Sequence, residues 1–220
     1  MADLALMYAE KAPSLQSKTF LAVMHGAFVG GACWILFHAG AAPLWRRIVL
    51  GTASTLYFLR VLVTSFVFVK RKMQWSEAIT VAVWVGFIHT LFAELGVHVR
   101  ASFGVLEGVA VALYLIGSFL NTGSEGLRHA WKKDPAHRGE LYTEGLFRYS
   151  MHINYFGDLV LFTGWALLAR SPWALLIPAV MFFGFRFANM PALDRYLARH
   201  YGAAFDDYRV RTKRLIPFVY

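Results

Sequence analysis

Cysteine is almost absent from this chain of 220 residues, and acidic residues are scarce. The single cysteine, Cys33, cannot form an intrachain disulfide, so the sequence does not indicate a redox compartment. Neither G-x-G-x-x-G nor G-x-x-x-x-G-K-[ST] occurs, which excludes a Rossmann or P-loop phosphate cradle. No cluster of histidines and carboxylates has the spacing of metal ligands, so we expect no metal site.

The alternating ten-residue pattern of a membrane β-barrel is also missing. Instead, 58% of the residues are hydrophobic and 16% aromatic, and the mean hydropathy is +0.48. A hydrocarbon core of about 30 Å requires roughly 20 helical residues. Six apolar stretches approach that length: 19–40, 48–69, 78–97, 103–120, 153–169 and 173–190. The sequence therefore predicts an all-α integral membrane bundle of about six to seven transmembrane helices with a cytoplasmic C-terminal tail.

We expect a single membrane domain over residues 1–220, with an N-terminal span and variable region at 1–47 and a core at 48–220. The first 18 residues lack the short apolar core and cleavage site of a signal peptide, so we expect the first span to remain. The tail, residues 191–220, is amphipathic and is expected to lie along the membrane interface.

Basic residues are distributed unevenly between the two sides that six spans would define. One side holds only Arg46, Arg47, Arg100 and Arg170 of the 22 Lys and Arg, and most of the others lie opposite. Positive loops stay inside, so both termini are expected in the cytoplasm. The basic residues behind the formal net charge of +9 lie at the predicted margins of the membrane. This distribution favours membrane lipids over nucleic acid as partners. A monomer is the simplest expectation.

Several ionisable residues lie within predicted spans, where they usually face a cavity or a partner. Arg60 is near the middle of the second span, and Tyr57 lies one turn earlier on the same face. An ion pair between Arg60 and Glu94 or Glu107 is the structural alternative. His25 and His89 are most simply residues that pack helices together.

A second polar group begins where the fourth span ends. Asn121 and Glu125 are four residues apart, and Arg128 and Lys132 continue the same helical face. Cations combined with Asn and Tyr donors suit an anionic, phosphate-bearing cofactor. The structural alternatives are helix termination for Asn121 and Glu125, and snorkelling to the interface for Lys132.

The fifth and sixth spans carry similar residues at the same expected end. Asn154 and Asp158 share one helical face, and Arg186 lies three residues before Asn189. Arg148 precedes the fifth span and is either a ligand for an anion or a snorkelling residue.

Residues 145–158, GLFRYSMHINYFGD, resemble the G-L-F-x-Y-x-x-x-x-N-Y-x-G-[DE] signature of the steroid 5α-reductase family and its bacterial relatives. NTGSEGLRHAWKK (121–133) resembles the helix that precedes this signature, RLIPFVY (214–220) the family ending, and LYFLR (56–60) the Y-F-x-R segment. The resemblance covers residues 48–220, roughly three-quarters of the chain. It indicates a bacterial inner-membrane member of a superfamily that also contains sterol reductases and isoprenylcysteine-type methyltransferases.

The resemblance implies NADPH-dependent reduction of a C=C bond in a lipid α,β-unsaturated ketone, most simply a 3-oxo-Δ4-steroid, and hence a role in lipid metabolism. Tyr57 would bind the substrate carbonyl with support from Arg60, and Glu94 is our candidate for a carboxylate partner of Tyr57. The candidate cofactor residues are Asn121, Glu125, Arg128, Lys132, Arg148, Tyr149, Asn154, Tyr155, Asp158, Arg186, Asn189, Tyr208 and Arg211.

The chain departs from the family pattern in three ways. Met151 and Ile153 replace a cation and a proline, and Met190 and Pro191 stand where a histidine is common. One span precedes the Tyr57 helix, where the eukaryotic enzymes have two and place the carboxylate partner of the tyrosine. Two alternatives therefore stay open: an S-adenosylmethionine-dependent membrane methyltransferase and a non-catalytic lipid-binding membrane protein.

Overall fold

Helices make up almost all of the secondary structure in the computed structural model, which describes residues 14–220. Within that range the only β structure is an isolated bridge between Ser150 and Lys213. The all-α prediction is therefore confirmed. The chain divides into two compact units. Unit 1 comprises Leu115–Leu161 and Pro178–Tyr220 among the described residues, and unit 2 comprises 14–114 and Phe162–Ile177.

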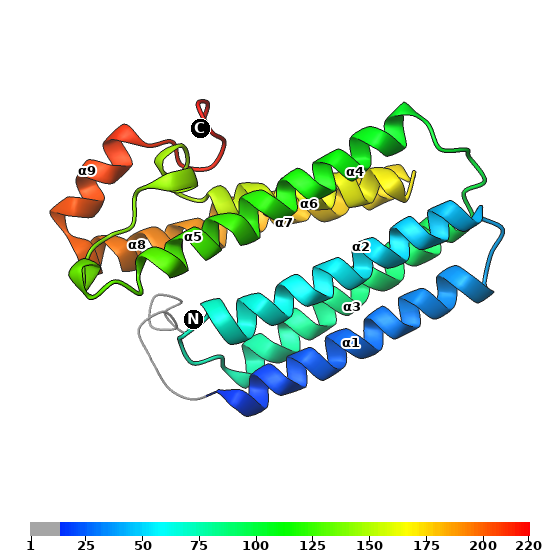
Figure 1. Cartoon of the computed structure of the whole chain (residues 1–220), viewed down its shortest axis with the longest axis horizontal. Coiled ribbons are helices and arrows are strands. Elements are labelled where there is room, and N and C mark those ends of the chain that lie inside the picture. Colours follow the sequence, from blue (N-terminus) through cyan, green and yellow to red (C-terminus); the bar gives the residue numbers. More distant parts are fainter. Residues whose placement is uncertain (1–13) are drawn as a thin grey trace. The chain divides into compact units, whose positions relative to one another are not determined.

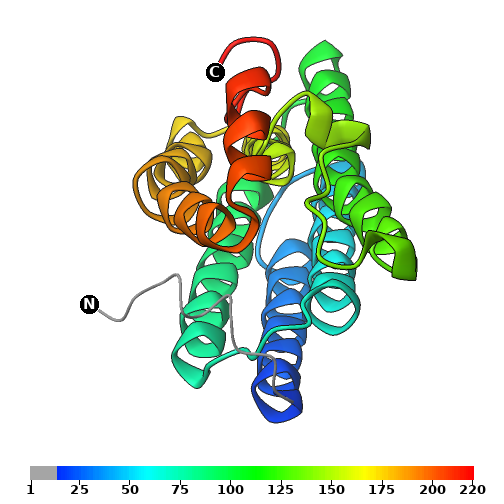
Figure 2. The same cartoon turned by 90° about the vertical axis from the view of Figure 1, so that its left-hand side faces the viewer.

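Unit 2 is built on three long helices, α1 (Leu15–His38), α2 (Leu44–Val63) and α3 (Trp75–Val97). They lie side by side in both views of the ribbon (Figures 1 and 2). Small residues recur on the buried face of α3 and allow close approach, which is typical of helices that pack within membranes. At Gly86, for example, a Cβ would lie 2.6 Å from the Phe28 ring.

Three further helices contribute residues to both units. They are α4 (Val105–Ser118), α6 (Ile153–Leu168) and α7 (Leu176–Gly184). A short 3-10 turn, Pro172–Leu175, leads into α7. Unit 1 adds α5 (Ser124–Trp131), α8 (Met190–Tyr201) and α9 (Ala203–Arg211), with 3-10 turns at Pro135–His137 and Gly145–Arg148.

Among residues 14–220, five helical segments are long and apolar enough to cross a membrane, as in a multi-pass integral membrane protein. They are Leu15–His38, Leu44–Phe68, Trp75–Val97, Val105–Trp131 and Pro172–Tyr201. The remaining predicted span, 153–169, is the 16-residue helix α6. At 1.5 Å per residue it is about 24 Å long, which is shorter than a hydrocarbon core of about 30 Å. The turn that precedes Ile153 is hydrogen-bonded to the C-terminal segment.

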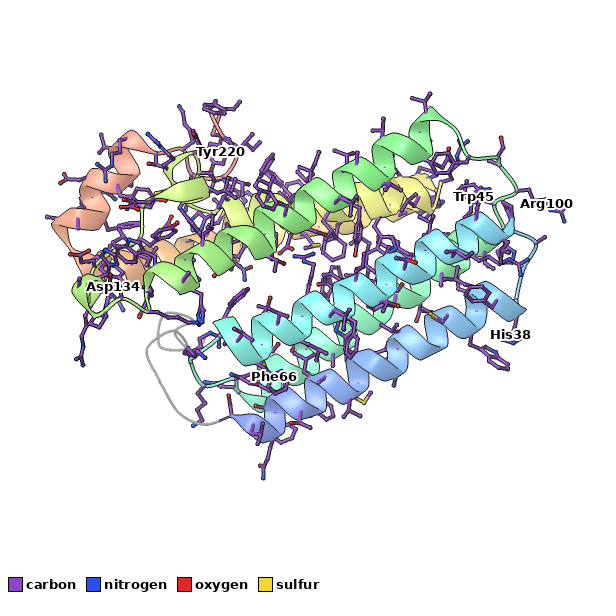
Figure 3. The ribbon with its side chains drawn as sticks, viewed as in Figure 1. His38, Trp45, Phe66, Arg100, Asp134 and Tyr220 are labelled. Carbon is purple, nitrogen blue, oxygen red and sulfur yellow. The ribbon has the colours of Figure 1, made fainter. Side chains whose placement is uncertain are left out.

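A buried ion-pair network ties together elements at one end of unit 2. Glu107 accepts from Arg46 at 3.1 Å and from Arg170 at 2.6 Å, and Glu107 and Arg46 are almost fully buried. The hydrogen bond to Glu107 raises the pKa of Arg170. Figure 3 shows Trp45 and Arg100 at this end of the helices and Phe66 at the other. Arg46 and Arg170, which were predicted to share one side of the membrane, are joined here through Glu107.

In unit 1 the helix that follows α4 ends as the sequence predicts. We expected it to stop near Lys133, before Asp134 and a proline; α5 ends at Trp131, and the Asp134 carboxylate accepts from the Ala136 amide at 2.9 Å. The tail forms α8 and α9, whose apolar side packs on Met151 and includes Leu197.

The long helices are interrupted by π-helical turns, which the sequence did not predict. They lie at Thr64–Phe68, Phe119–Gly123 and Phe185–Asn189. The second contains Asn121, and the third begins one residue before Arg186. Because π turns in α-helices are frequent at functional sites, both point to the same candidate residues.

Candidate functional site

The signature segment is held in place by the end of the chain. The backbone amides of Met151 and His152 donate to the carbonyls of Lys213 and Arg214 at 2.8 and 3.1 Å. The buried hydroxyl of Ser150 donates to the Leu215 carbonyl at 2.7 Å. In Figure 1 the C-terminal loop (red) accordingly lies beside the turn that precedes α6. Two of the segments that carry the family resemblance, 145–158 and 214–220, are therefore hydrogen-bonded to each other.

A buried histidine extends this connection to α8. His152 is fully buried, and its Nε2 lies 2.8 Å from Oδ1 of Asp194. Nε and Nη2 of Arg214 donate to Oδ2 of the same carboxylate at 3.0 and 2.8 Å. Sequence reasoning missed this network, although His152 lies inside the quoted signature, because its partners lie 42 and 62 residues further along the chain.

The structure brings four of the predicted cofactor residues together. Nδ2 of Asn121 donates to the backbone carbonyl of Asn154 at 3.0 Å, and Nδ2 of Asn154 donates to Oε1 of Glu125 at 2.9 Å. The other Glu125 oxygen accepts from Arg128. Glu125 is only 7% exposed, and a buried carboxylate needs partners; here Arg128 and the Asn154 amide compensate its charge. We call Asn121, Glu125, Arg128 and Asn154 the amide–carboxylate cluster.

Two glycines allow the helices of this cluster to approach. A Cβ at Gly157 would lie 2.5 Å from the Asn121 amide nitrogen, and one at Gly117 would lie 2.3 Å from the Leu161 nitrogen. Real Cβ atoms do not come so close to backbone atoms. The cluster therefore depends on glycine at both positions.

The other predicted cations of unit 1 are on different elements and have separate surroundings. Lys132 donates to the Tyr201 hydroxyl at 3.1 Å, and Arg148 and Arg211 are exposed. The Arg186 guanidinium carbon lies 5.4 Å from the Phe187 ring centroid and 5.5 Å from that of Tyr220. Asp158 and Asn189 are partly buried.

Three predicted tyrosines have distinct surroundings. Tyr149 is exposed, with its ring centroid 5.6 Å from that of Phe218. Tyr155 stacks between His152 and Phe185, at centroid distances of 5.4 and 4.5 Å. The Tyr208 hydroxyl donates to the Phe147 carbonyl at 2.6 Å, and burial raises the pKa of Tyr208 well above its ordinary value.

The predicted substrate residues belong to unit 2. The Tyr57 ring lies 5.1 and 5.7 Å, centroid to centroid, from Phe162 and Trp165 of α6, and the Arg60 guanidinium carbon is 5.7 Å from its centroid. Glu94 is exposed near the end of α3, with its carboxylate 4.0 Å from His98.

The structural alternative for Arg60 gains no support from Glu107. Both oxygens of that carboxylate are held by other groups, Oε1 by Arg46 and Arg170 and Oε2 by the Gly104 amide. Within residues 14–220 no group of three or more His, Cys, Asp or Glu side chains could hold a metal ion.

From the sequence, we interpret two histidines only as residues that pack helices together. His25 of α1 and His89 of α3 are fully buried, and their Nε2 atoms are 2.7 Å apart. Their rings lie 5.6 and 5.9 Å from the Tyr57 ring. Each histidine lies near the middle of a predicted span, where ionisable residues usually have a function, and this position was the signal that could have identified them.

Comparison with known proteins gives consistent matches. The model of the family described as "Protein of unknown function (DUF1295)" matches residues 74–212, more than half of the chain. The Delta(14)-sterol reductase erg24 of Schizosaccharomyces pombe is 28% identical over 154 residues, which are 63% of this chain and 36% of that protein.

Two mammalian proteins are also similar. The 3-oxo-5-alpha-steroid 4-dehydrogenase 2 of Homo sapiens is 29% identical over 51% of this chain and 42% of its own. The 3-oxo-5-alpha-steroid 4-dehydrogenase 1 of Rattus norvegicus is 32% identical over 49% of this chain and 40% of its own. The chain thus spans less than half the length of these curated relatives.

Proposed function

Because this chain belongs to the steroid 5α-reductase-like DUF1295 family, we propose that it reduces the C=C bond of a lipid α,β-unsaturated ketone with NADPH. The substrate we favour is a 3-oxo-Δ4-steroid, reduced to the 5α-product. The observation that carries this proposal is the amide–carboxylate cluster, which the signature helix α6 and the helix α5 build together. The family relatives named above are steroid and sterol reductases.

The residues of unit 1 suit a phosphate-bearing dinucleotide. Arg148 and Arg211 are exposed cations, and Arg186 lies between two aromatic rings. Guanidinium groups pair with phosphate in a bidentate manner, and exposed rings such as Tyr149 offer stacking surfaces for a base. Buried Glu125 has no free charge left to repel an anion, because Arg128 and Asn154 engage it. When bound, the nicotinamide supplies the hydride.

In unit 2, Tyr57 is the proposed donor to the substrate carbonyl. Negative charge grows on the carbonyl oxygen when a hydride adds to the β-carbon of an enone. A hydroxyl directed at that oxygen stabilises the charge in the transition state more than in the ground state. Arg60, close to the Tyr57 ring, adds a positive potential. Glu94 stays a proposed partner of Tyr57, although the structure places its carboxylate near His98.

The proposed location follows from charge and from the substrate. A steroid partitions into lipid, and large apolar side chains such as Trp34, Val83 and Phe183 are exposed on the spanning helices. We propose that both termini face the cytoplasm of a bacterium, where NADPH is available, and that the protein lies in the inner membrane as a monomer.

The test uses the full chain in lipid nanodiscs. Thermal unfolding is measured with NADPH, NADH or S-adenosylmethionine, and progesterone or testosterone is then added while NADPH absorbance is followed. We expect stabilisation by NADPH and formation of the 5α-product. Stabilisation by S-adenosylmethionine alone would favour the methyltransferase. The absence of any cofactor effect would favour the non-catalytic lipid-binding protein.

A matched pair of variants makes the test specific. Asn154→Ala removes the amide that binds Glu125, whereas Asp206→Asn alters an exposed ion pair with Arg209 on α9. The proposal requires that the first variant loses the NADPH effect and that the second keeps it.

A further inference from the structure

The hydrogen bond between His25 and His89 makes the two rings chemically unequal. Their Nε2 atoms are 2.7 Å apart, so one Nε2 must carry a proton and the other must accept it. In neutral rings, the ring that donates through Nε2 has a bare Nδ1, and the ring that accepts has a protonated Nδ1. The pair therefore presents one donor and one acceptor at its outer nitrogens.

Among residues 14–220 these outer nitrogens have no hydrogen-bond partner. Nδ1 of His25, Nδ1 of His89 and the indole nitrogen of Trp165 are buried without a hydrogen bond within the described structure. All three residues are fully buried. An unsatisfied buried polar atom is costly, and within a membrane it usually marks a functional position. The three atoms are therefore expected to bind water or the polar atom of a ligand.

The rings that carry the unsatisfied atoms lie close to the ring of Tyr57, the proposed donor to the substrate carbonyl. The Tyr57 ring is within 6 Å, centroid to centroid, of His25, His89 and Trp165. These three residues come from α1, α3 and α6, and all belong to unit 2. We call Tyr57, His25, His89 and Trp165 the Tyr57 cluster.

The charged groups near the cluster do not offer a second proton donor. The Arg60 guanidinium on α2 lies near the Tyr57 ring and stays protonated. On α3 the Glu94 carboxylate is exposed beside His98, and on α4 Glu107 is held by Arg46 and Arg170. On α4 the Tyr114 hydroxyl donates to the Ala53 carbonyl.

We propose that His25 and His89 are the positioning pair that supplies protons to Tyr57, an inference that rests on the proposed reductase function. Reduction of an enone adds one hydride at the β-carbon and consumes one proton from water. Tyr57 gives its hydroxyl proton to the carbonyl oxygen, so the O–H bond of Tyr57 breaks and an enol forms. The enol then becomes the ketone by losing its hydroxyl proton and gaining one at the α-carbon.

The histidine pair restores the Tyr57 hydroxyl. The protonated Nδ1 of one ring gives its proton to the phenolate through a bridging water molecule, because neither Nδ1 is hydrogen-bonded to another protein group within residues 14–220. The shared proton then moves across to the Nε2 of that ring. The Nδ1 of the second ring then takes a proton from water. One proton from solvent has been consumed, and the two rings have exchanged tautomers.

Glutamine variants test the transfer step. In His25→Gln and His89→Gln the amide can still form the hydrogen bond between the helices but cannot pass a proton on. We expect kcat to fall at least about tenfold, in the range typical of acid–base groups, with a larger solvent deuterium isotope effect. Stabilisation by NADPH should be unchanged. The control is His38→Gln, an exposed residue of the same helix α1 that stacks on Trp34.

A spectroscopic measurement provides a readout independent of turnover. In the wild-type protein with ¹⁵N-labelled histidine, we expect one buried ring protonated at Nδ1 and one at Nε2. Adding the saturated ketone product without cofactor should shift both signals. Identical tautomers in the two rings, or signals that do not respond to the ketone, would overturn the proposal even if neither glutamine variant folds.

The two proposals fail in different ways. If the wild-type protein neither binds NADPH nor reduces an enone, the proposed function is wrong. If the wild-type protein reduces the enone while both glutamine variants keep its kcat and isotope effect, the histidine pair does not supply the proton.

Discussion

The side-chain amide of Asn154 donates to the carboxylate of Glu125 at 2.9 Å, across a separation of 29 residues in the chain. It joins the first turn of α6 to the first turn of α5. Arg128 completes the arrangement from the other side of the carboxylate.

The first prediction concerns this contact. In Asn154→Ala, Glu125 keeps only Arg128 as a partner within the cluster. The hydrogen bond that holds α6 to α5 is then lost. A hydrogen bond to a charged group contributes about 1.5–3 kcal/mol, so we expect the Kd for NADPH to rise at least about tenfold. Titration calorimetry in nanodiscs measures this change. If the Kd of Asn154→Ala for NADPH equals that of the reference variant Asp206→Asn, the cluster does not contribute to cofactor binding.

The second prediction concerns Tyr57. The Tyr57→Phe variant keeps the ring contacts with Phe162 and Trp165 but lacks the hydroxyl. Because the hydroxyl acts mainly as charge develops, we expect kcat to fall by about 10²–10³ while the Kd for NADPH stays the same. Steady-state kinetics and a binding titration distinguish the two effects. Equal losses in both quantities would contradict the assignment.

The third prediction concerns the close approach of α4 and α6. In Gly157→Ala the new Cβ would lie 2.5 Å from the Asn121 nitrogen and 2.8 Å from the Gly117 oxygen, and both are backbone atoms. Overpacking of this kind costs about 1–3 kcal/mol, so Tm should fall and NADPH binding should weaken. Gly184→Ala is the control, since a Cβ there has no neighbour within 4 Å. A Gly157→Ala protein with the wild-type Tm would show that α4 and α6 can move apart without a loss of stability.

The fourth prediction concerns the buried Glu107. Glu107→Gln removes the charge that compensates Arg46, whose side chain is 1% exposed. Breaking one partner of a buried ion pair costs about 3–5 kcal/mol. Tm in detergent should fall strongly, whereas Glu140→Gln at an exposed position should change stability by less than about 0.5 kcal/mol. Similar Tm values for the two variants would refute the structural role of the network.

The fifth prediction concerns alkaline pH. Burial holds the pKa of Tyr208 above its ordinary value of about 10, so the folded state binds this proton more tightly than the unfolded state. The resulting stability is complete below about pH 10 and is lost as the pH rises further. In Tyr208→Phe the decline of Tm between pH 9 and 11 should be shallower than in the wild type. Burial also raises the pKa of Tyr142, which leaves part of the decline in place. An unaltered pH profile would contradict the prediction.

Much of the helical architecture could be predicted from the sequence, because length and hydropathy limit what can cross a bilayer. The five long segments overlap the predicted spans, and Asp134 marks the end of α5 as expected. The span predicted at 153–169 coincides with α6, Ile153–Leu168, to within one residue. The hydrogen bond of Ser150 to Leu215, which precedes the first turn of α6, was not predictable, because hydropathy contains no information about such a contact.

Part of the candidate site was predictable because its residues share one helix. The spacing of Asn121, Glu125 and Arg128 indicates one helical face, and the structure places them together. The pairing of His152 with Asp194 was not foreseen, because it joins residues on different helices and each looks ordinary in its own segment.

The sequence by itself determined the class of protein, the positions of the long helices and the segments that carry the family resemblance, since these depend on local composition and short spacings. The tertiary structure alone decided that the C-terminal segment is hydrogen-bonded to the signature and that Asn121 and Arg186 lie in π-helical turns. It also decided that the Nε2 atoms of His25 and His89 lie 2.7 Å apart, close to the Tyr57 ring. Such features arise from packing between segments far apart in the chain. Helix periodicity specifies which face is buried, but not which residue of another helix it meets.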